Sequence, residues 1–130
     1  MIDNTRVTEH KRALFNQACE LLGVNPSKVS LVSASDYGRG SVMGLGKYLA
    51  TVDARRRVMT VSSDAVEFDV YVHELLHILF PRAKHDWIRG VTAVLEGRGS
   101  GGVVWGRSYV QPKGELEVLI GRAITRRGLD

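Results

Sequence analysis

Apolar residues recur every three to four positions near the start of the chain, and this spacing predicts a helix over residues 8–22. Gly23 follows the last apolar position and is a typical helix stop. Cys19 lies within the apolar stripe, so we interpret it as a packing residue rather than a reactive thiol. The predicted core face of this helix comprises Leu14, Phe15, Ala18, Cys19 and Leu22.

Three shorter segments have the composition of β-strands. Residues 28–34 are apolar and β-branched, and residues 47–53 and 57–63 alternate around a polar turn, which predicts a hairpin. Residues 36–46 contain four glycines but lack the spacing of a phosphate-binding loop, so we expect an ordinary loop there. The arginines at 55–57 crowd the hairpin turn, where we expect them to be solvated.

Residues 65–80 are apolar on most sides, which predicts a buried helix rather than one that lies on the surface. Asp64 is placed to cap its N-terminus, with Glu67 three residues later in a capping-box arrangement. Pro81 is expected to end the helix.

The C-terminal part predicts two more helices, over residues 86–96 with Asp86 as its cap and over residues 112–127. Five glycines at 97–106 suggest either a lid over a substrate or a disordered connection, followed by a short strand within 103–110. We therefore predict one α+β domain over residues 1–130. Its small, mostly antiparallel sheet would carry the hairpin packed on the buried helix, with further helices at the flanks.

The amino-acid composition and net charge limit the classes of protein to which this chain can belong. Of 130 residues, 44% are hydrophobic and 25% are charged, which is typical of a soluble domain with its own core. A single cysteine excludes an intramolecular disulfide, and the N-terminus lacks the apolar segment of a signal peptide, so we expect a cytoplasmic protein without a membrane span. The net charge of +4 permits contact with nucleic acid without requiring it, and the oligomeric state stays open.

The predicted buried helix carries three side chains that can bind a metal or transfer a proton, namely His73, Glu74 and His77. Two histidines four residues apart share one helix face and can point at a single metal ion, for which zinc is well suited. Glu74 lies about 100° around the helix from His73, which suits it to accept a proton from a zinc-bound water rather than to bind the metal. A metal beside this carboxylate would also offset the cost of burying it.

A tight zinc site requires a third ligand. His85 is the first candidate, because the chain can turn back after Pro81 and bring it to the metal. Glu96 is an alternative ligand at the end of the next predicted helix. Asp86 is a further alternative, as a ligand or as an acceptor for a histidine N–H, although we favour its capping role. His10, on a polar face of the first helix, is expected to be unrelated to the site.

The stretch HELLH, residues 73–77, on a helix that follows a β-hairpin resembles the zincin metallopeptidases. In that family the two histidines bind zinc and the glutamate is the general base. An edge strand, here residues 47–53, commonly lies antiparallel to the bound peptide. A third histidine opening the next helix is similar to the small SprT-like and related minimal zincins, whereas a downstream glutamate ligand is the thermolysin-type arrangement. The glycine and methionine turn that metzincins carry after the motif are absent here. The resemblance covers residues 44–96 and implies a minimal zincin-like fold.

These observations together predict a zinc-dependent metallopeptidase that hydrolyses peptide or protein substrates. Zn²⁺ would be held by His73, His77 and His85, and a zinc-bound water would be activated by Glu74. Tyr109 and Tyr71 are candidate donors to the oxyanion. The alternative is a non-catalytic zinc-binding domain that acts as a protein- or nucleic-acid-binding module. Its contact surface would be formed by Arg55, Arg56, Arg57, Arg122, Arg126 and Arg127.

Overall fold

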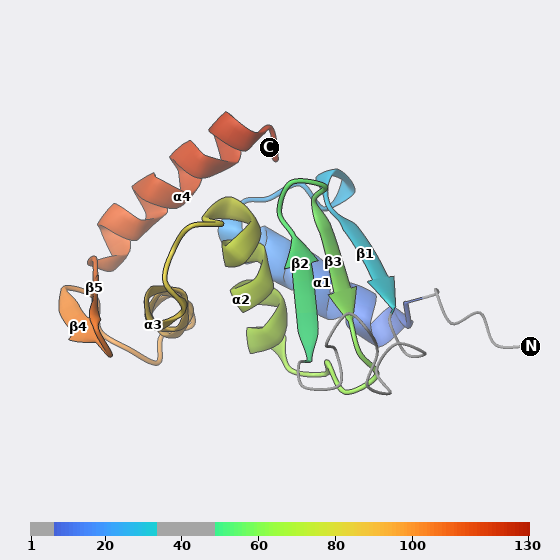
Figure 1. The fold of residues 1–130 in the computed structure, drawn as a ribbon, viewed down its shortest axis with the longest axis horizontal. Helices are drawn as coiled ribbons and strands as arrows, with labels where there is room; N and C mark the ends of the chain where they lie inside the picture. Colours follow the sequence, from blue (N-terminus) through green and yellow to red (C-terminus); the bar gives the residue numbers. More distant parts are fainter. Residues whose placement is uncertain (1–6, 34–48) are drawn as a thin grey trace, which may run out of the picture.

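The computed structural model describes residues 7–33 and 49–130, which form an α+β structure (Figure 1). The predicted glycine loop at 36–46 lies outside the described residues. Four α-helices, one short 3-10 helix, a three-stranded mixed sheet and a two-stranded hairpin make up the described part. In chain order these are α1 (Glu9–Leu22), η1 (Pro26–Lys28), β1 (Ser30–Ser33), β2 (Ala50–Asp53), β3 (Val58–Val61), α2 (Phe68–Leu79), α3 (His85–Leu95), β4 (Val103–Trp105), β5 (Ser108–Val110) and α4 (Lys113–Arg127).

Helix α1 begins and ends close to where the sequence predicts. The Thr8 hydroxyl accepts a hydrogen bond from the Lys11 backbone N–H, and Gly23 closes the helix with a φ of 88°. Phe15 and Cys19 are fully buried within the predicted apolar stripe. Burial raises the pKa of the Cys19 thiol to about 12, which agrees with a packing role.

The three-stranded sheet has the order β1-β3-β2. The predicted hairpin is confirmed, since β2 and β3 are antiparallel with Val52 opposite Met59. The expectation of a mostly antiparallel sheet is wrong, because β1 runs parallel to β3 with Leu31 opposite Met59. Strand β3 therefore lies in the centre, and β2 is an edge of the sheet that the described residues form.

Helix α2 begins at Phe68, later than the sequence predicts, because residues 62–65 form a turn in which the Ala65 N–H donates to the Ser62 carbonyl. The predicted cap is wrong: Glu67 is the N-cap residue, and no side-chain hydrogen bond caps the helix. The buried Tyr71 hydroxyl instead donates to the Ala65 carbonyl at 2.6 Å, which ties this turn to the helix. Figure 1 shows α2 between the sheet and α3, where most of its surface joins the core.

The hairpin β4–β5 packs on α3, and a small residue allows this close approach. A Cβ atom on Gly90 of α3 would lie 2.5 Å from Val110 Cγ2 and 3.0 Å from Trp105 Cβ. The sequence predicts a single strand in this region, whereas two short strands pair there, with Val103 opposite Val110. Part of the glycine-rich segment is therefore regular structure rather than a disordered connection.

Helix α4 matches its predicted range to within one residue and packs against α2 and α3 through its apolar face. Arg126 and Arg127 lie in its last turn, where positive charge favours the helix dipole. Among the described residues, no helix is long and apolar enough to cross a membrane.

Candidate metal centre

One face of α2 is only partly buried, and it includes the two histidines and the glutamate of the helix. Val70, His73, Glu74 and His77 are half-buried, whereas the apolar residues of the other faces from Tyr71 to Leu79 are buried. These four positions follow the i, i+3, i+4, i+7 spacing of a single helix face. The imidazoles and the carboxylate therefore all face one side of α2, away from the core.

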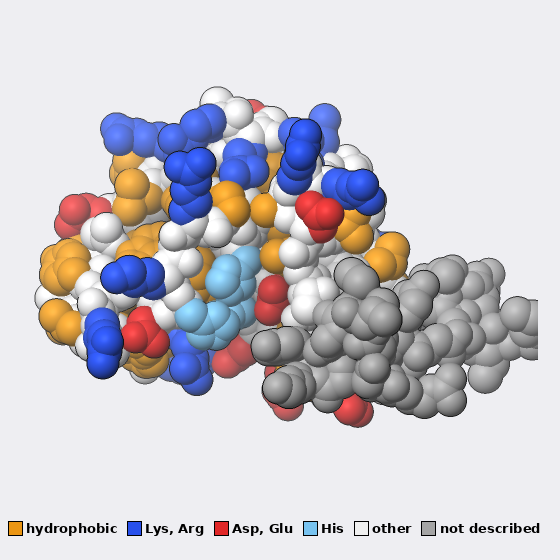
Figure 2. All heavy atoms as spheres, viewed as in Figure 1, with side chains coloured by type: hydrophobic (Ala, Val, Ile, Leu, Met, Phe, Trp, Pro, Cys, Tyr) orange, Lys and Arg blue, Asp and Glu red, His pale blue; other side chains and the backbone are white. Residues whose placement is uncertain are grey.

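The structure brings His85 to the two histidines of α2. The nitrogen atoms of His73, His77 and His85 that can bind a metal lie within 4.8 Å of one another. His73 Nε2 and His77 Nε2 are 3.1 Å apart, and the His85 ring centroid lies 4.6 Å from that of His73. Figure 2 shows the histidine side chains as one patch open to solvent, with acidic side chains beside them.

The distance between the His73 and His77 nitrogens fits a tetrahedral metal ion. Zinc–nitrogen bonds of about 2.0–2.1 Å at tetrahedral angles separate two ligand nitrogens by about 3.3 Å, close to the 3.1 Å between His73 and His77. No hydrogen bond of the described residues ties either imidazole to a backbone carbonyl, so both Nε2 atoms face the shared space. The cluster is thus a possible three-histidine metal site.

The surroundings favour the neutral imidazoles that a metal requires. Burial lowers the pKa of His73 to about 4, and the charges of His77, His85 and Arg89 act in the same direction. Burial, followed by the charge of His85, also lowers the pKa of His77. Both shifts favour the uncharged imidazole, whose nitrogen lone pair is the one that binds a cation.

Glu74 lies beside the cluster in the same cleft as His85. Burial raises the pKa of its carboxyl to about 7. No salt bridge to Glu74 occurs among the described residues. Its carboxyl therefore lies in the cleft without an ion-pair partner among the described residues, and a proton-transfer role for it stays a prediction.

The structure separates the other two ligand candidates from the cluster. Glu96 caps the end of α3, where its carboxylate contacts Arg98 at 3.5 Å and adjoins Asp69. Asp86 is not the helix cap, because α3 begins one residue earlier, at His85, and Lys84 is the N-cap residue. The Asp86 carboxylate instead accepts the Arg107 backbone N–H at 3.2 Å, which fastens the β4–β5 turn to α3.

The cluster sits in a cleft that runs beside the edge strand β2. One arm, of about 340 Å³, is lined by Thr51, Val52 and Ala54 of the hairpin together with Pro81. The other arm, of about 690 Å³, extends past Leu49 towards the far end of the strand. Ala50, Glu74 and His85 line both arms, so the histidine cluster lies at the middle of a channel bordered by a strand edge.

Neither tyrosine proposed for the oxyanion reaches this cleft. Tyr71 is fully buried and donates to Ala65, and Tyr109 lines a different cavity. Arg89, which the sequence analysis missed, lines the cleft arm that holds His73 and Glu74. It lies four residues after His85, on the same face of α3, and this spacing is the signal that could have revealed it.

Comparison of this chain with protein-family models, with curated proteins and with solved structures finds no match.

Proposed function

We propose that the protein is a zinc-dependent peptidase whose active site is the three-histidine cluster. The observation that carries this proposal is the convergence of three imidazoles beside a carboxylate with no ion-pair partner among the described residues, in a cleft along a strand edge. The resemblance of residues 73–77 to the zincin motif agrees with it. The minimal zincin-like fold is part of the same proposal.

His73, His77 and His85 would hold the metal. Three imidazoles form a donor set suited to zinc and leave one position open, as catalytic sites require, whereas a structural site takes a fourth protein ligand. A zinc ion there supplies a Lewis acid that polarises the scissile carbonyl and acidifies water.

Glu74 would act as the proton carrier. Its carboxylate takes a proton from the attacking water and delivers it to the nitrogen of the leaving amine. The nearby positive charge of a metal favours the ionised carboxylate, which the first of these steps requires. Arg89 would donate to the oxyanion that forms as the carbonyl carbon becomes tetrahedral.

Strand β2 would position the substrate. Among the described strands it pairs with β3 alone, so the backbone groups along its other edge can bind an extended peptide as an added strand. The cleft follows this strand from Leu49 to Ala54 and passes the histidines midway. An extended polypeptide is therefore the ligand whose shape matches the channel.

The test compares zinc content and peptide cleavage of the wild type with those of Glu74→Gln. We expect both proteins to hold about one zinc ion per chain, and cleavage to fall by roughly 10²–10⁴-fold in the variant. Glu67→Gln is a matched control, because Glu67 is exposed at the start of the same helix and its side chain makes no capping bond. Activity that survives Glu74→Gln would reject the mechanism. Zinc binding by a wild type that cleaves nothing in a broad peptide library would favour the non-catalytic binding module.

A further inference from the structure

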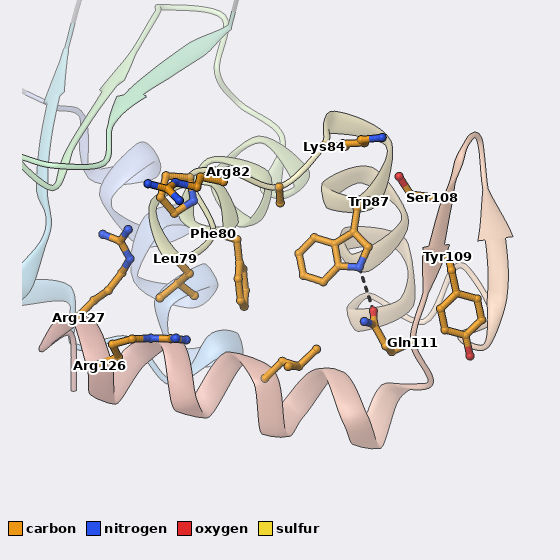
Figure 3. Close-up of a pocket in the computed structure, with 13 residues that line it drawn as sticks. Leu79, Phe80, Arg82, Lys84, Trp87, Ser108, Tyr109, Gln111, Arg126 and Arg127 are labelled. Carbon is orange, nitrogen blue, oxygen red and sulfur yellow. Dashed lines mark hydrogen bonds between the residues drawn. The ribbon is translucent and has the colours of Figure 1, made fainter.

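A second cavity, of about 880 Å³, lies between the end of α2, the start of α3, β5 and α4 (Figure 3). Its walls include the aliphatic Leu79 and Leu119 and the aromatic Phe80 and Trp87. In Figure 3 the side chains of Leu79, Phe80 and Trp87 point into the space above α4. None of them belongs to the histidine cluster, so the peptidase site does not account for this cavity.

Positive charge surrounds the apolar interior. Arg82 and Lys84 line one side, from the loop between α2 and α3, and Arg126 and Arg127 line the other, from the last turn of α4. Of the described residues that line the cavity, none is an aspartate or a glutamate. The cavity therefore complements a ligand that combines an apolar group with negative charge.

The cavity adjoins the cleft of the histidine cluster. Pro81 lines both the cavity and the cleft arm that contains His85 and Glu74. Lys84, on the cavity wall, immediately precedes His85 in the chain. A polypeptide that leaves the cleft past Pro81 thus enters the cavity directly.

The aromatic side chains favour a polypeptide over a single-stranded nucleic acid. Phe80 and Trp87 pack edge to face with ring centroids 5.0 Å apart, and the Trp87 indole N–H already donates to Gln111 at 2.9 Å. Nucleobases bind to open aromatic faces, whereas these two rings pack against each other beside aliphatic side chains. Such walls suit leucine-like or phenylalanine-like side chains.

We infer that this cavity is an exosite for protein substrates of the peptidase, and that it binds a hydrophobic side chain flanked by aspartate or glutamate on one side of the scissile bond. The inference rests on the proposed function for the link between the two sites. If the substrate lies antiparallel to β2, the segment in the cavity is N-terminal to the scissile bond. The chain then runs from Pro81 towards Leu49 along the cleft.

Binding can be tested without cleavage, in the Glu74→Gln background. The probe is a fluorescent peptide with a leucine–phenylalanine pair flanked by glutamates, followed by a neutral extended segment, and its binding is measured by anisotropy. We expect Arg126→Glu to weaken binding by about tenfold. Arg122→Glu should change it by less than about twofold, because Arg122 lies one turn earlier on α4, is equally exposed and does not line the cavity.

A change on the peptide side tests the same contact without altering the protein. When the glutamates of the probe are replaced by glutamine, the protein with the unaltered cavity should bind it about as weakly as Arg126→Glu binds the acidic probe. With this neutral probe, Arg126→Glu and Arg122→Glu should bind with the same affinity. Equal effects of Arg126→Glu and Arg122→Glu, or equal binding of the acidic and the neutral peptide, would overturn the inference. A single-stranded oligonucleotide could instead displace the peptide, bind more tightly than it and lose affinity in Arg126→Glu. That result would assign the cavity to nucleic acid.

These experiments distinguish failure of the exosite from failure of the proposed peptidase function. Acidic-peptide binding in a protein that holds no zinc would leave the cavity as a docking site and remove the peptidase. Cleavage without any preference for acidic peptides would retain the peptidase and remove the exosite. A peptide with the acidic block moved to the C-terminal side should be cleaved less efficiently if the exosite lies on the N-terminal side.

Discussion

The cleft beside β2 and the cavity above α4 share Pro81, yet they differ in chemistry. The cleft is lined by the imidazoles of His73, His77 and His85 and by the Glu74 carboxyl, whose pKa burial raises to about 7. The cavity holds permanent cations around apolar walls. Imidazoles and a carboxyl can bind a metal or exchange protons, whereas the apolar walls and arginines of the cavity suit recognition of a ligand. Under the proposed function, the reaction would take place on one side of Pro81 and recognition on the other.

The largest effect should follow from removal of a metal ligand in the cleft. His77→Ala should lose zinc and hydrolysis together, since two remaining imidazoles make a weak site. His10→Ala, an exposed histidine on α1, should retain both. Zinc should raise the melting temperature of the wild type and of His10→Ala but not that of His77→Ala, because only a bound ligand stabilises the folded state. Unchanged zinc content in His77→Ala would contradict the site.

Substitution of one arginine in each region should separate the roles of the cleft and the cavity. Arg89→Met in the cleft should lower kcat by roughly 10²-fold with zinc content unchanged, because an oxyanion donor is lost. Arg126→Met in the cavity should raise KM for acidic substrates and leave kcat unchanged, because it removes only recognition. Steady-state kinetics on one acidic peptide separates the two. A rise in KM alone for Arg89→Met would exclude it from the reaction.

Titration of Glu96, which lies beside the cleft residues Asp69 and Arg98, should be visible in the stability of the protein. Burial raises the pKa of Glu96 to about 7, aided by its hydrogen bond to Asp69 and by the charge of that group, and opposed by Arg98. The folded protein therefore binds more protons than the unfolded chain between about pH 4.5 and 7, so this group makes stability fall as pH rises through that window.

Glu96→Gln removes this proton uptake. Its free energy of unfolding relative to the wild type should increase by up to about 1 kcal/mol from pH 4.5 to pH 7.5, measured by urea denaturation. Glu117→Gln on the exposed face of α4 should show no such trend, nor should Arg126→Met. A constant difference across this pH range would show that Glu96 titrates normally in the folded state.

The smallest effect concerns the hairpin that both regions share, since Trp105 lines the cleft and Tyr109 lines the cavity. Gly90→Ala should destabilise the protein by about 1 kcal/mol, because the clash with Val110 and Trp105 outweighs the better helix propensity of alanine. Gly121→Ala on α4, whose added Cβ meets nothing within 4 Å, should stabilise it by a similar amount. Thermal melts of the two variants provide the test, and a stabilised Gly90→Ala would mean that the hairpin does not pack on α3 as closely as described.

The sequence alone determined the local features of the fold and the placement of two of the three clustered histidines, His73 and His77. Helical periodicity, Thr8 and Gly23 predicted α1, alternation predicted the β2–β3 hairpin, and the four-residue spacing of His73 and His77 placed both on one face of α2. All of these depend on contacts between residues close in the chain, which a local pattern records.

Only the tertiary structure decided how distant segments meet. The parallel pairing of β1 with β3, the choice of His85 over Glu96 beside the histidine pair, and the placement of Arg89 in the cleft depend on the packing of whole elements against one another. The same holds for the cavity above α4, where residues of the α2–α3 loop meet the last turn of a helix some forty positions later. Pairing partners, ligand sets and cavities are properties of surfaces that come together on folding. Because the free energy of that packing is shared over the whole core, no single stretch of sequence specifies it.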